Sequence, residues 1–168
     1  MPLLDIGAGY GMLKEFVEQS TALKYYGVDV YPKFDGVLKV ENGSTLPPEI
    51  MSMQFGVVAS LNVFQHLSIA QRRHYMEQVQ KILIPNLGVF TVTISLMHPQ
   101  NPRFKGFVCK ETGKQYMCHY GQYTEVQGVQ EFINDLVKHF NILSFSERCD
   151  GSYTFNCSAK ELDKTPVV

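Results

Sequence analysis

The sequence predicts an α/β fold built on a mostly parallel sheet. Two observations favour it: segments rich in β-branched and aromatic residues alternate with segments of helical spacing, and a glycine-rich turn joins the first expected strand to the first expected helix. A chain of 168 residues has room for one substantial core. We therefore expect a single domain over residues 1–168.

The first elements are expected in quick succession. Residues 2–6 form a short apolar run that indicates a buried strand, and after the glycines a helix is expected from about residue 12 to 18. Residues 24–30 and 36–40 are predicted to be the second and third strands. Because a parallel pair normally needs a long crossover, residues 31–35 must cross as a turn or a single helical turn.

The middle of the chain continues the alternation. Residues 55–61 are predicted to be the fourth strand, and residues 68–84 an amphipathic helix with Ser68 as its N-cap. Residues 87–94 are dense in β-branched side chains and are expected to form a central strand.

The alternation then fails over residues 97–122, which we expect to be an irregular insertion. Long loops of this kind tend to be functional. Order returns with a helix near residues 126–140. Residues 142–148 and 152–159 are predicted to be two strands joined at Asp150-Gly151, a strong hairpin signal.

The glycine turn carries the first functional signal. In the run Asp5-Ile6-Gly7-Ala8-Gly9-Tyr10-Gly11 the glycines are spaced G-x-G-x-G, which differs from the dinucleotide fingerprint G-x-G-x-x-G. Such a turn presents backbone N–H groups and a positive helix end to a ligand, while an acid beside it would repel a pyrophosphate and favour a cationic group. The alternative is a tight turn that binds nothing and needs only positive φ angles.

The second signal is Asp29, at the end of the second predicted strand. An acid at this place accepts hydrogen bonds from both ribose hydroxyls, so a nucleoside ligand is expected. An Asp at a strand end is also common as a helix cap or turn former, and Asp29 alone would be a weak signal.

Three segments resemble the successive motifs of class I S-adenosylmethionine-dependent methyltransferases in order and spacing: residues 4–11 (LDIGAGYG), 26–29 (YGVD) and 54–67 (QFGVVASLNVFQHL). The similarity runs from about Leu3 to Ala159. It implies a Rossmann-like methyltransferase fold, with a mostly parallel seven-stranded sheet and an antiparallel C-terminal hairpin. It also implies S-adenosylmethionine as the cofactor and S-adenosylhomocysteine as the product.

The resemblance also implies which residues would hold the cofactor. Asp5 would lie near the ammonium group of the methionine moiety, Asp29 would hold the ribose, and Asn42 would meet the adenine where the family often has Asp. The implied cofactor-binding set is Asp5, Gly7, Ala8, Gly9, Gly11, Asp29, Val30, Asn42, Gly43, Ser60 and Leu61.

Two departures from the family stand out. The family usually has a helix before the first strand that closes over cofactor and substrate, and this chain starts almost directly at the strand. We therefore expect a fold lacking that N-terminal helix and an open site, or one completed by a protein partner or an oligomer. The second departure is Gly56, which stands where the family commonly has Asp.

A general base is hard to assign from the sequence. His66, just ahead of the helix that begins near Ser68, is the catalytic candidate; alternatively it packs and hydrogen-bonds at the helix start. Transfer from a sulfonium needs little acid–base help beyond alignment of donor and acceptor and the removal of one proton from the acceptor, so many such enzymes could work without a dedicated base.

The insertion supplies the candidates for substrate recognition, because it follows the fifth strand at the edge where α/β proteins bind ligands. The alternative is a solvated excursion with a local hairpin. The substrate-binding candidates are His98, Arg103, Tyr116, His119 and Tyr120.

A metal clip or labile disulfide is conceivable within the insertion. If Gly113-Lys114 forms a two-residue hairpin loop, Cys109 falls opposite Cys118, with His119 adjacent. The spacing is not that of the common zinc motifs, so no metal is predicted.

Composition narrows the function classes. A net charge of -1 makes nucleic acid an unlikely partner, no apolar run is long enough to span a membrane, and the few, widely spaced cysteines favour reduced thiols in a cytoplasmic protein. The usual base-methylating signatures after the fourth strand are missing. We expect methyl transfer to a small-molecule oxygen or nitrogen acceptor. The alternatives are a catalytically inactive methyltransferase-like structural or interaction subunit, and a protein methyltransferase.

Overall fold

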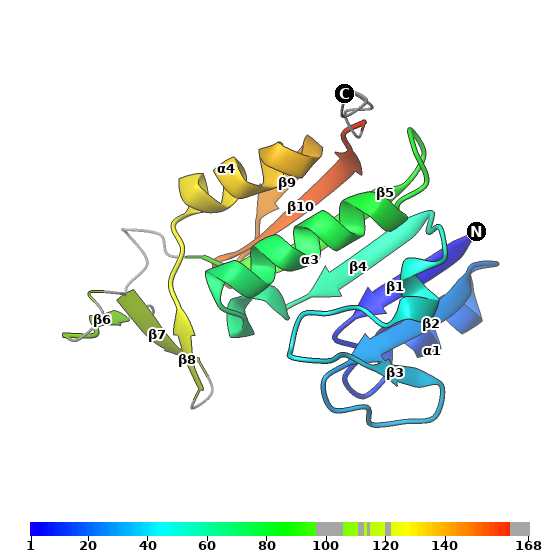
Figure 1. Ribbon diagram of the computed structural model, residues 1–168, viewed down its shortest axis with the longest axis horizontal. Coiled ribbons are helices and arrows are strands. Elements are labelled where there is room, and N and C mark those ends of the chain that lie inside the picture. Colours follow the sequence, from blue (N-terminus) through cyan, green and yellow to red (C-terminus); the bar gives the residue numbers. More distant parts are fainter. Residues whose placement is uncertain (97–105, 111–112, 114, 120–121, 162–168) are drawn as a thin grey trace, which may run out of the picture.

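Figure 1 shows a computed structural model of the chain. It describes residues 1–96, 106–110, 113, 115–119 and 122–161, and over the strands between residues 106 and 124 it describes the backbone without the side chains. The predicted substrate residues His98, Arg103 and Tyr120 lie outside the described residues.

Seven strands form the main sheet, in the order β3-β2-β1-β4-β5-β10-β9. Strands β1 to β5 run parallel, and β10 pairs antiparallel with both β5 and β9. The mostly parallel seven-stranded sheet with a C-terminal antiparallel hairpin is therefore confirmed. The strands are β1 (Pro2–Ile6), β2 (Lys24–Asp29), β3 (Val37–Lys39), β4 (Val57–Leu61), β5 (Val89–Ser95), β9 (Phe140–Glu147) and β10 (Ser152–Ala159).

Helices cover the sheet on both faces. Since β2 and β5 lie on opposite sides of the β1–β4 pair, right-handed crossovers place the helix before β2 and the helix before β5 on opposite faces. In Figure 1, α3 and α4 lie in front of the sheet and α1 lies behind it. The helices are α1 (Met12–Ser20), α2 (Pro48–Met51), α3 (Ile69–Ile82) and α4 (Val129–His139), with the 3₁₀ turn η1 (Phe64–His66) before α3.

The main core lies between the sheet and the helices α3 and α4. Its rings interlock across elements: Phe64 contacts Phe90 at 6.0 Å and Phe132 at 6.4 Å between ring centroids, and Phe132 contacts Phe155 at 5.4 Å. Burying one such side chain is worth about 1.5–3 kcal/mol. This core holds η1 and the start of α3 firmly against the carboxyl ends of β4 and β5. The core residues of the helices are Tyr75, Met76, Val79 and Ile82 of α3, and Phe132 and Leu136 of α4.

Ser68 is the N-cap of α3, as predicted. Its hydroxyl accepts a hydrogen bond from Gln71 N at 3.2 Å, and Gln71 Oε1 accepts one from Ser68 N at 2.9 Å, so the two residues form a capping box. The short elements α2 and η1, by contrast, are not predicted from the sequence.

The short connection between β2 and β3 is a turn without a helix, one of the two possibilities that the sequence left open. The strands still pair in parallel, with Gly27 opposite Val37 and Asp29 opposite Lys39. Gly36 takes a φ of 86°, a left-handed conformation that suits glycine and turns the chain back toward the sheet.

The described residues between 106 and 125 include strands, where the sequence suggested an irregular insertion over residues 97–122. The strands β6 (Gly106–Val108), β7 (Gln115–His119) and β8 (Gln122–Glu125) pair antiparallel as a second sheet in the order β6-β7-β8. Strands this short are difficult to recognise from alternation. The second sheet lies beyond the carboxyl ends of β4 and β5, and β8 contacts η1 (Figure 1).

The strand register differs from the hairpin that would place Cys109 opposite Cys118. Val108 pairs with Gln115, and Gly106 pairs with Met117, so Cys118 falls beyond the paired residues of β6 and not opposite Cys109. The register therefore does not support a clip between them. Among the described residues there is no metal-binding group of His, Cys, Asp or Glu side chains, and no helix there is long and apolar enough to cross a membrane.

Candidate functional site

A cavity of about 920 Å³ opens at the carboxyl ends of β1 and β2 and continues to the start of α3. This is the point where the strand order reverses, with β2 on one side of β1 and β4 on the other, and ligands of α/β proteins bind in that crevice. The volume is in the range of small-molecule sites. The cavity is lined by Gly7, Gly9, Tyr10, Asp29, Val30, Tyr31, Lys39, Val40, Glu41, Asn42, Gly43, Val63, His66, Leu67, Gln71 and Tyr75.

The glycine turn at the floor of the cavity needs its glycines. Gly7, Gly9 and Gly11 have φ angles of 82°, 52° and 82°, in the left-handed region that favours glycine. Position 7 needs glycine for a second reason, because a Cβ built there would overlap the side chain of Val63.

Hydrogen bonds fix the turn to β2. Gly7 N and Ala8 N both donate to Val28 O, at 2.8 and 3.1 Å. Gly9 N donates to Asp29 Oδ2 at 2.9 Å. The glycine turn and the acid at the end of β2, which are 20 residues apart in the sequence, therefore form one unit.

Asp29 is held by backbone N–H groups on both of its oxygens. Its Oδ1 accepts from Tyr31 N at 2.8 Å, and its Oδ2 accepts from Gly9 N. A carboxylate has about four lone-pair sites, so each oxygen retains acceptor capacity toward the cavity. The backbone therefore holds the carboxylate in one orientation.

Asp5 lies beneath the turn and does not line the cavity. Its side chain is 4% exposed, and Asp5 Oδ2 accepts a hydrogen bond from the Tyr25 hydroxyl at 2.8 Å. Burial raises the pKa of Asp5 to about 6; the Tyr25 hydrogen bond opposes this rise and the charge of Asp29 adds to it. Burial, followed by the charge of Asp5, raises the pKa of Tyr25.

Sequence reasoning missed Tyr25, and the residue that makes room for it is Gly27. A Cβ at Gly27 would lie 2.9 Å from the Tyr25 hydroxyl and 3.1 Å from the Cβ of Ala8. Since Asp5 pairs with Gly27 across the two strands, the missing side chain leaves the space that the phenol occupies.

The opposite wall of the cavity combines the turn after β3 with α3. Asn42 and Gly43 have φ angles of 50° and 72°, and Gln71 Nε2 donates to Asn42 O at 3.4 Å. A Cβ at Gly43 would lie 2.7 Å from Gln71 Nε2, so the glycine permits this close approach. Gln78, two helical turns further on, donates to Ser44 O at 2.7 Å and holds the end of the same turn.

Arg72 fixes the position of η1, which carries His66. The Arg72 side chain is 2% exposed; its Nε donates to Phe64 O at 2.8 Å, its Nη1 to Gln127 Oε1 at 3.1 Å and its Nη2 to Glu125 O at 2.9 Å. Burial lowers the pKa of Arg72 to about 10, so it remains a cation at neutral pH. Through these bonds one guanidinium joins η1 to the end of β8.

The network continues to α4 through Asp135. Its carboxylate accepts hydrogen bonds from Gln127 Nε2 at 2.7 Å, Arg73 Nε at 2.9 Å and Lys138 Nζ at 2.7 Å. Burial alone would raise the pKa of Asp135, but these three donors outweigh it and hold the pKa below its usual value.

The structure brings together part of the predicted set of cofactor-binding and catalytic residues. Gly7, Gly9, Asp29, Val30, Asn42, Gly43 and the candidate base His66 all line the cavity. Ala8 is buried behind the turn, Ser60 is fully buried and Leu61 is 42% exposed, and none of these three lines the cavity. Of Tyr116 and His119 the structure describes the backbone, in β7.

Several lining residues were missed by sequence reasoning. Gln71 and Tyr75 are four positions apart on α3 and therefore lie on one face of the helix. A polar residue on a stripe of core residues is the signal that could have indicated them. Tyr10, Tyr31, Lys39, Val40, Glu41, Val63 and Leu67 complete the missed set.

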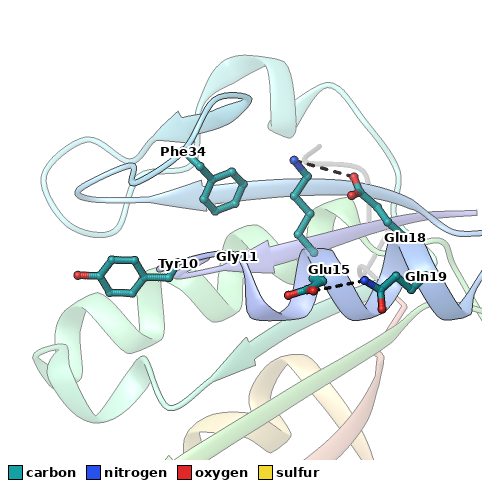
Figure 2. Close-up of a pocket in the computed structure, with 7 residues that line it drawn as sticks. Tyr10, Gly11, Glu15, Glu18, Gln19 and Phe34 are labelled. Carbon is teal, nitrogen blue, oxygen red and sulfur yellow. Dashed lines mark hydrogen bonds and ion pairs between the residues drawn. The ribbon is translucent and has the colours of Figure 1, made fainter.

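A smaller groove of about 340 Å³ lies on the outer side of the turn, between α1 and the connection from β2 to β3 (Figure 2). Lys14 Nζ lies 5.1 Å from the centre of the Phe34 ring and 4.0 Å from Glu18 Oε1. The Phe34 ring packs against Gly11, which lines this groove and not the larger cavity. Tyr10, which is 86% exposed, borders both spaces.

The chain resembles known proteins in its fold, without a detectable resemblance in sequence. No protein-family model matches the chain, and no curated protein sequence matches it significantly. Solved structures do match. The PH0226 protein from Pyrococcus horikoshii OT3 superposes with a TM-score of 0.73 at 16% identity, covering 95% of this chain and 82% of that one.

Two further structures are named methyltransferases. An S-adenosylmethionine-dependent methyltransferase from Mesorhizobium loti has a TM-score of 0.64 at 13% identity and covers 94% of this chain and 90% of its own. The N-methyltransferase NodS from Bradyrhizobium japonicum WM9, in complex with S-adenosylhomocysteine, has a TM-score of 0.61 at 14% identity. The match covers 95% of this chain and 78% of NodS. The chain therefore has the Rossmann-like fold of class I methyltransferases.

Proposed function

We propose that this chain binds S-adenosylmethionine and transfers its methyl group to an oxygen or nitrogen of a small molecule. The observation that carries the proposal is the joining of the glycine turn to Asp29 in one cavity, through the bond from Gly9 N to Asp29 Oδ2. Neighbours of the same fold are described as bound to S-adenosylmethionine or S-adenosylhomocysteine, which supports this choice of ligand.

The residues present fit such a cofactor. The remaining acceptor sites of Asp29 suit the two ribose hydroxyls, and Asn42 and Gly43 stand at the far side of the same cavity for the adenine. Asp5, buried below the turn, adds negative charge near a cationic methionine moiety. When bound, the cofactor supplies an electrophilic methyl group on a sulfonium.

The chain's own contribution to transfer is positioning. Fixing donor and acceptor in line supplies most of the acceleration that such a reaction needs. His66, which lines the cavity from η1, is the residue we assign to remove a proton from the acceptor. For acceptor recognition we propose residues of the segment that follows β5: His98, Arg103, Tyr116, His119 and Tyr120.

The experiment is calorimetric titration of the chain with S-adenosylmethionine and S-adenosylhomocysteine, repeated with Asp29→Ala, Asp29→Asn and Asp35→Asn. Because hydrogen bonds to a charged group are worth about 1.5–3 kcal/mol, we expect Asp29→Ala to weaken binding by roughly tenfold to a hundredfold. Asp29→Asn removes the charge and turns its amide N–H group toward Gly9 N or Tyr31 N, so it should lose about as much affinity as Asp29→Ala. Asp35→Asn changes an exposed acid on the β2–β3 connection and should bind like the unmodified chain.

A chain that binds neither compound would contradict the proposal. It would favour the second candidate function, a non-catalytic interaction subunit. That candidate has its own supporting observation: Tyr10, Met12, Phe16 and Tyr31 are largely exposed around the turn and the start of α1, and exposed apolar side chains that gather in one place are typical of docking surfaces. A polypeptide acceptor would use the same surface, and an acceptor screen with small molecules and peptides separates these two activities.

A further inference from the structure

Tyr75 is a buried tyrosine on the wall of the cavity that neither the glycine turn nor the acid motif predicts. It comes from the second turn of α3, four residues after Gln71, and it lines the cavity although its side chain is only 2% exposed. Its ring lies against Phe64, with 5.8 Å between ring centroids. The ring is therefore fixed by the core, and the phenol end is directed by α3.

The hydroxyl of Tyr75 has no hydrogen-bond partner within the described part of the chain. The described side-chain atoms that are both fully enclosed and unpartnered are Ser60 Oγ and Gln65 Oε1, so the Tyr75 hydroxyl is not sealed in the core. A buried tyrosine normally finds a partner for its O–H. Here the cavity is the space from which that partner can come.

The position of Tyr75 in the cavity is fixed by its neighbours. Gln71, one helical turn earlier on the same face, donates to Asn42 O, so Tyr75 stands on the wall that carries the turn after β3. Across the cavity lies Asp29, whose charge acts on the phenol: burial first, and Asp29 second, raise the pKa of Tyr75. The phenol stays protonated at neutral pH and can donate a hydrogen bond.

We propose that the Tyr75 hydroxyl donates a hydrogen bond to the nucleoside half of the ligand, between the groups that Asp29 and Asn42 contact. This inference rests on the proposed function and adds a recognition residue to it. It assigns α3 a direct part in cofactor selection, in addition to its part in the core.

The test is Tyr75→Phe, which removes the hydroxyl and keeps the ring in the core. Affinities for S-adenosylhomocysteine and for adenosine are measured by calorimetry on the unmodified chain, on Tyr75→Phe and on the control Tyr153→Phe. Tyr153 is also buried, but it lies on β10 and does not line the cavity. Thermal melting of all three proteins confirms that each is folded.

We expect Tyr75→Phe to weaken both ligands by the same factor, about five- to tenfold, the usual worth of one neutral hydrogen bond. Tyr153→Phe should leave both affinities within about twofold of the unmodified chain, the ordinary reproducibility of such free energies. An equal loss on both ligands places the contact on the part they share, the nucleoside.

Two results would overturn the inference while leaving the proposed function intact. One is unchanged binding of S-adenosylhomocysteine by Tyr75→Phe. The other is a loss for S-adenosylhomocysteine without a loss for adenosine, which would place the contact on the amino-acid half. If the unmodified chain bound neither ligand, the proposed function itself would fall, and this inference with it.

Discussion

The two walls of the cavity are built in different ways. The glycine wall, Gly7–Gly11 with Asp29, is held by backbone N–H groups that donate to Val28 O and Asp29 Oδ2 within one β–α–β unit. The helix wall, Val63–Leu67 with Gln71 and Tyr75, is held by side chains, above all by Arg72. Its partners Glu125 and Gln127 are 53 and 55 residues away in the sequence.

This difference has a consequence for how each wall responds to change. The glycine wall depends on backbone conformation, so it is sensitive to any added Cβ and tolerant of changes in distant side chains. The helix wall depends on a few buried polar side chains, and the loss of one leaves several partners unsatisfied at once. Substitutions on each wall can therefore test the comparison directly.

The largest effect is expected from Arg72→Met on the helix wall. The change leaves the buried and part-buried acceptors Phe64 O, Glu125 O and Gln127 Oε1 without their donors, and since each unsatisfied acceptor costs about 1–3 kcal/mol, we expect a loss of about 4 kcal/mol. Urea unfolding measures the loss. Arg73→Met is the matched control: its side chain is 52% exposed and Asp135 retains two other donors, so its cost should stay near 1 kcal/mol. Equal costs for the two variants would show that the helix wall does not depend on Arg72.

The next largest effect concerns Asp5, below the glycine wall. Its pKa in the folded chain is about 6 against an ordinary 3.8, so the folded state holds its proton more tightly than the unfolded state does. Stability should therefore fall as pH rises from about 4 to about 6 and stay level above that window. Asp5→Asn removes the titrating group and still accepts from Tyr25. It should gain about 3 kcal/mol at pH 7 and less than about 1 kcal/mol at pH 4.

Urea unfolding across this pH range checks the prediction, with Asp35→Asn as the control because Asp35 is exposed. A gain for Asp5→Asn that is the same at pH 4 and pH 7 would contradict the burial of an unfavourable charge. If S-adenosylmethionine binds as we propose, Asp5→Asn should also bind it more weakly, because the change removes negative charge beneath the proposed place of the methionine moiety.

A smaller loss is expected from Gly7→Ala on the glycine wall. The added methyl group must tolerate a φ of 82° and displace the Val63 side chain, and a left-handed residue with a Cβ costs about 1–2 kcal/mol before any overlap is counted. The double variant Gly7→Ala with Val63→Ala should recover the part due to overlap. A thermal-melting cycle of the four proteins separates the two parts, and full additivity would show that Val63 does not press on the turn.

The smallest effect is expected from Gln71→Ala. It removes the capping-box acceptor for Ser68 N and the donor to Asn42 O, at a cost of about 1 kcal/mol in stability. Because Gln71 holds the turn that carries Asn42, adenosine affinity should fall as well. Gln130→Ala, a change of an exposed glutamine on α4, is the control that should alter neither quantity.

The sequence could predict the glycine wall because its determinants are local. The G-x-G-x-G spacing, the acid at the end of β2 and the short β2–β3 connection can each be recognised within a few residues, and the structure brings Gly7, Gly9 and Asp29 to one cavity. The helix wall could be predicted only in outline. Ser68 indicated where α3 begins, but the roles of Arg72 and Tyr75 depend on contacts that exist only after folding. The sequence did not predict strands β6 to β8 for a different reason: each is too short for an alternation of apolar and polar residues to be recognised.

The doubly held carboxylate of Asp29 bears on the thermodynamics of recognition. Tyr31 N and Gly9 N fix the rotamer of this side chain, so a ligand that meets it has no rotamer freedom left to freeze. Ordering one free side chain on binding typically costs about 0.5–1.5 kcal/mol. The Asp29 side chain is already ordered in the folded chain, so binding does not add this entropy loss. In the proposed complex the acid at the end of β2 would be a preorganised acceptor, and its contribution to affinity should appear mainly as enthalpy.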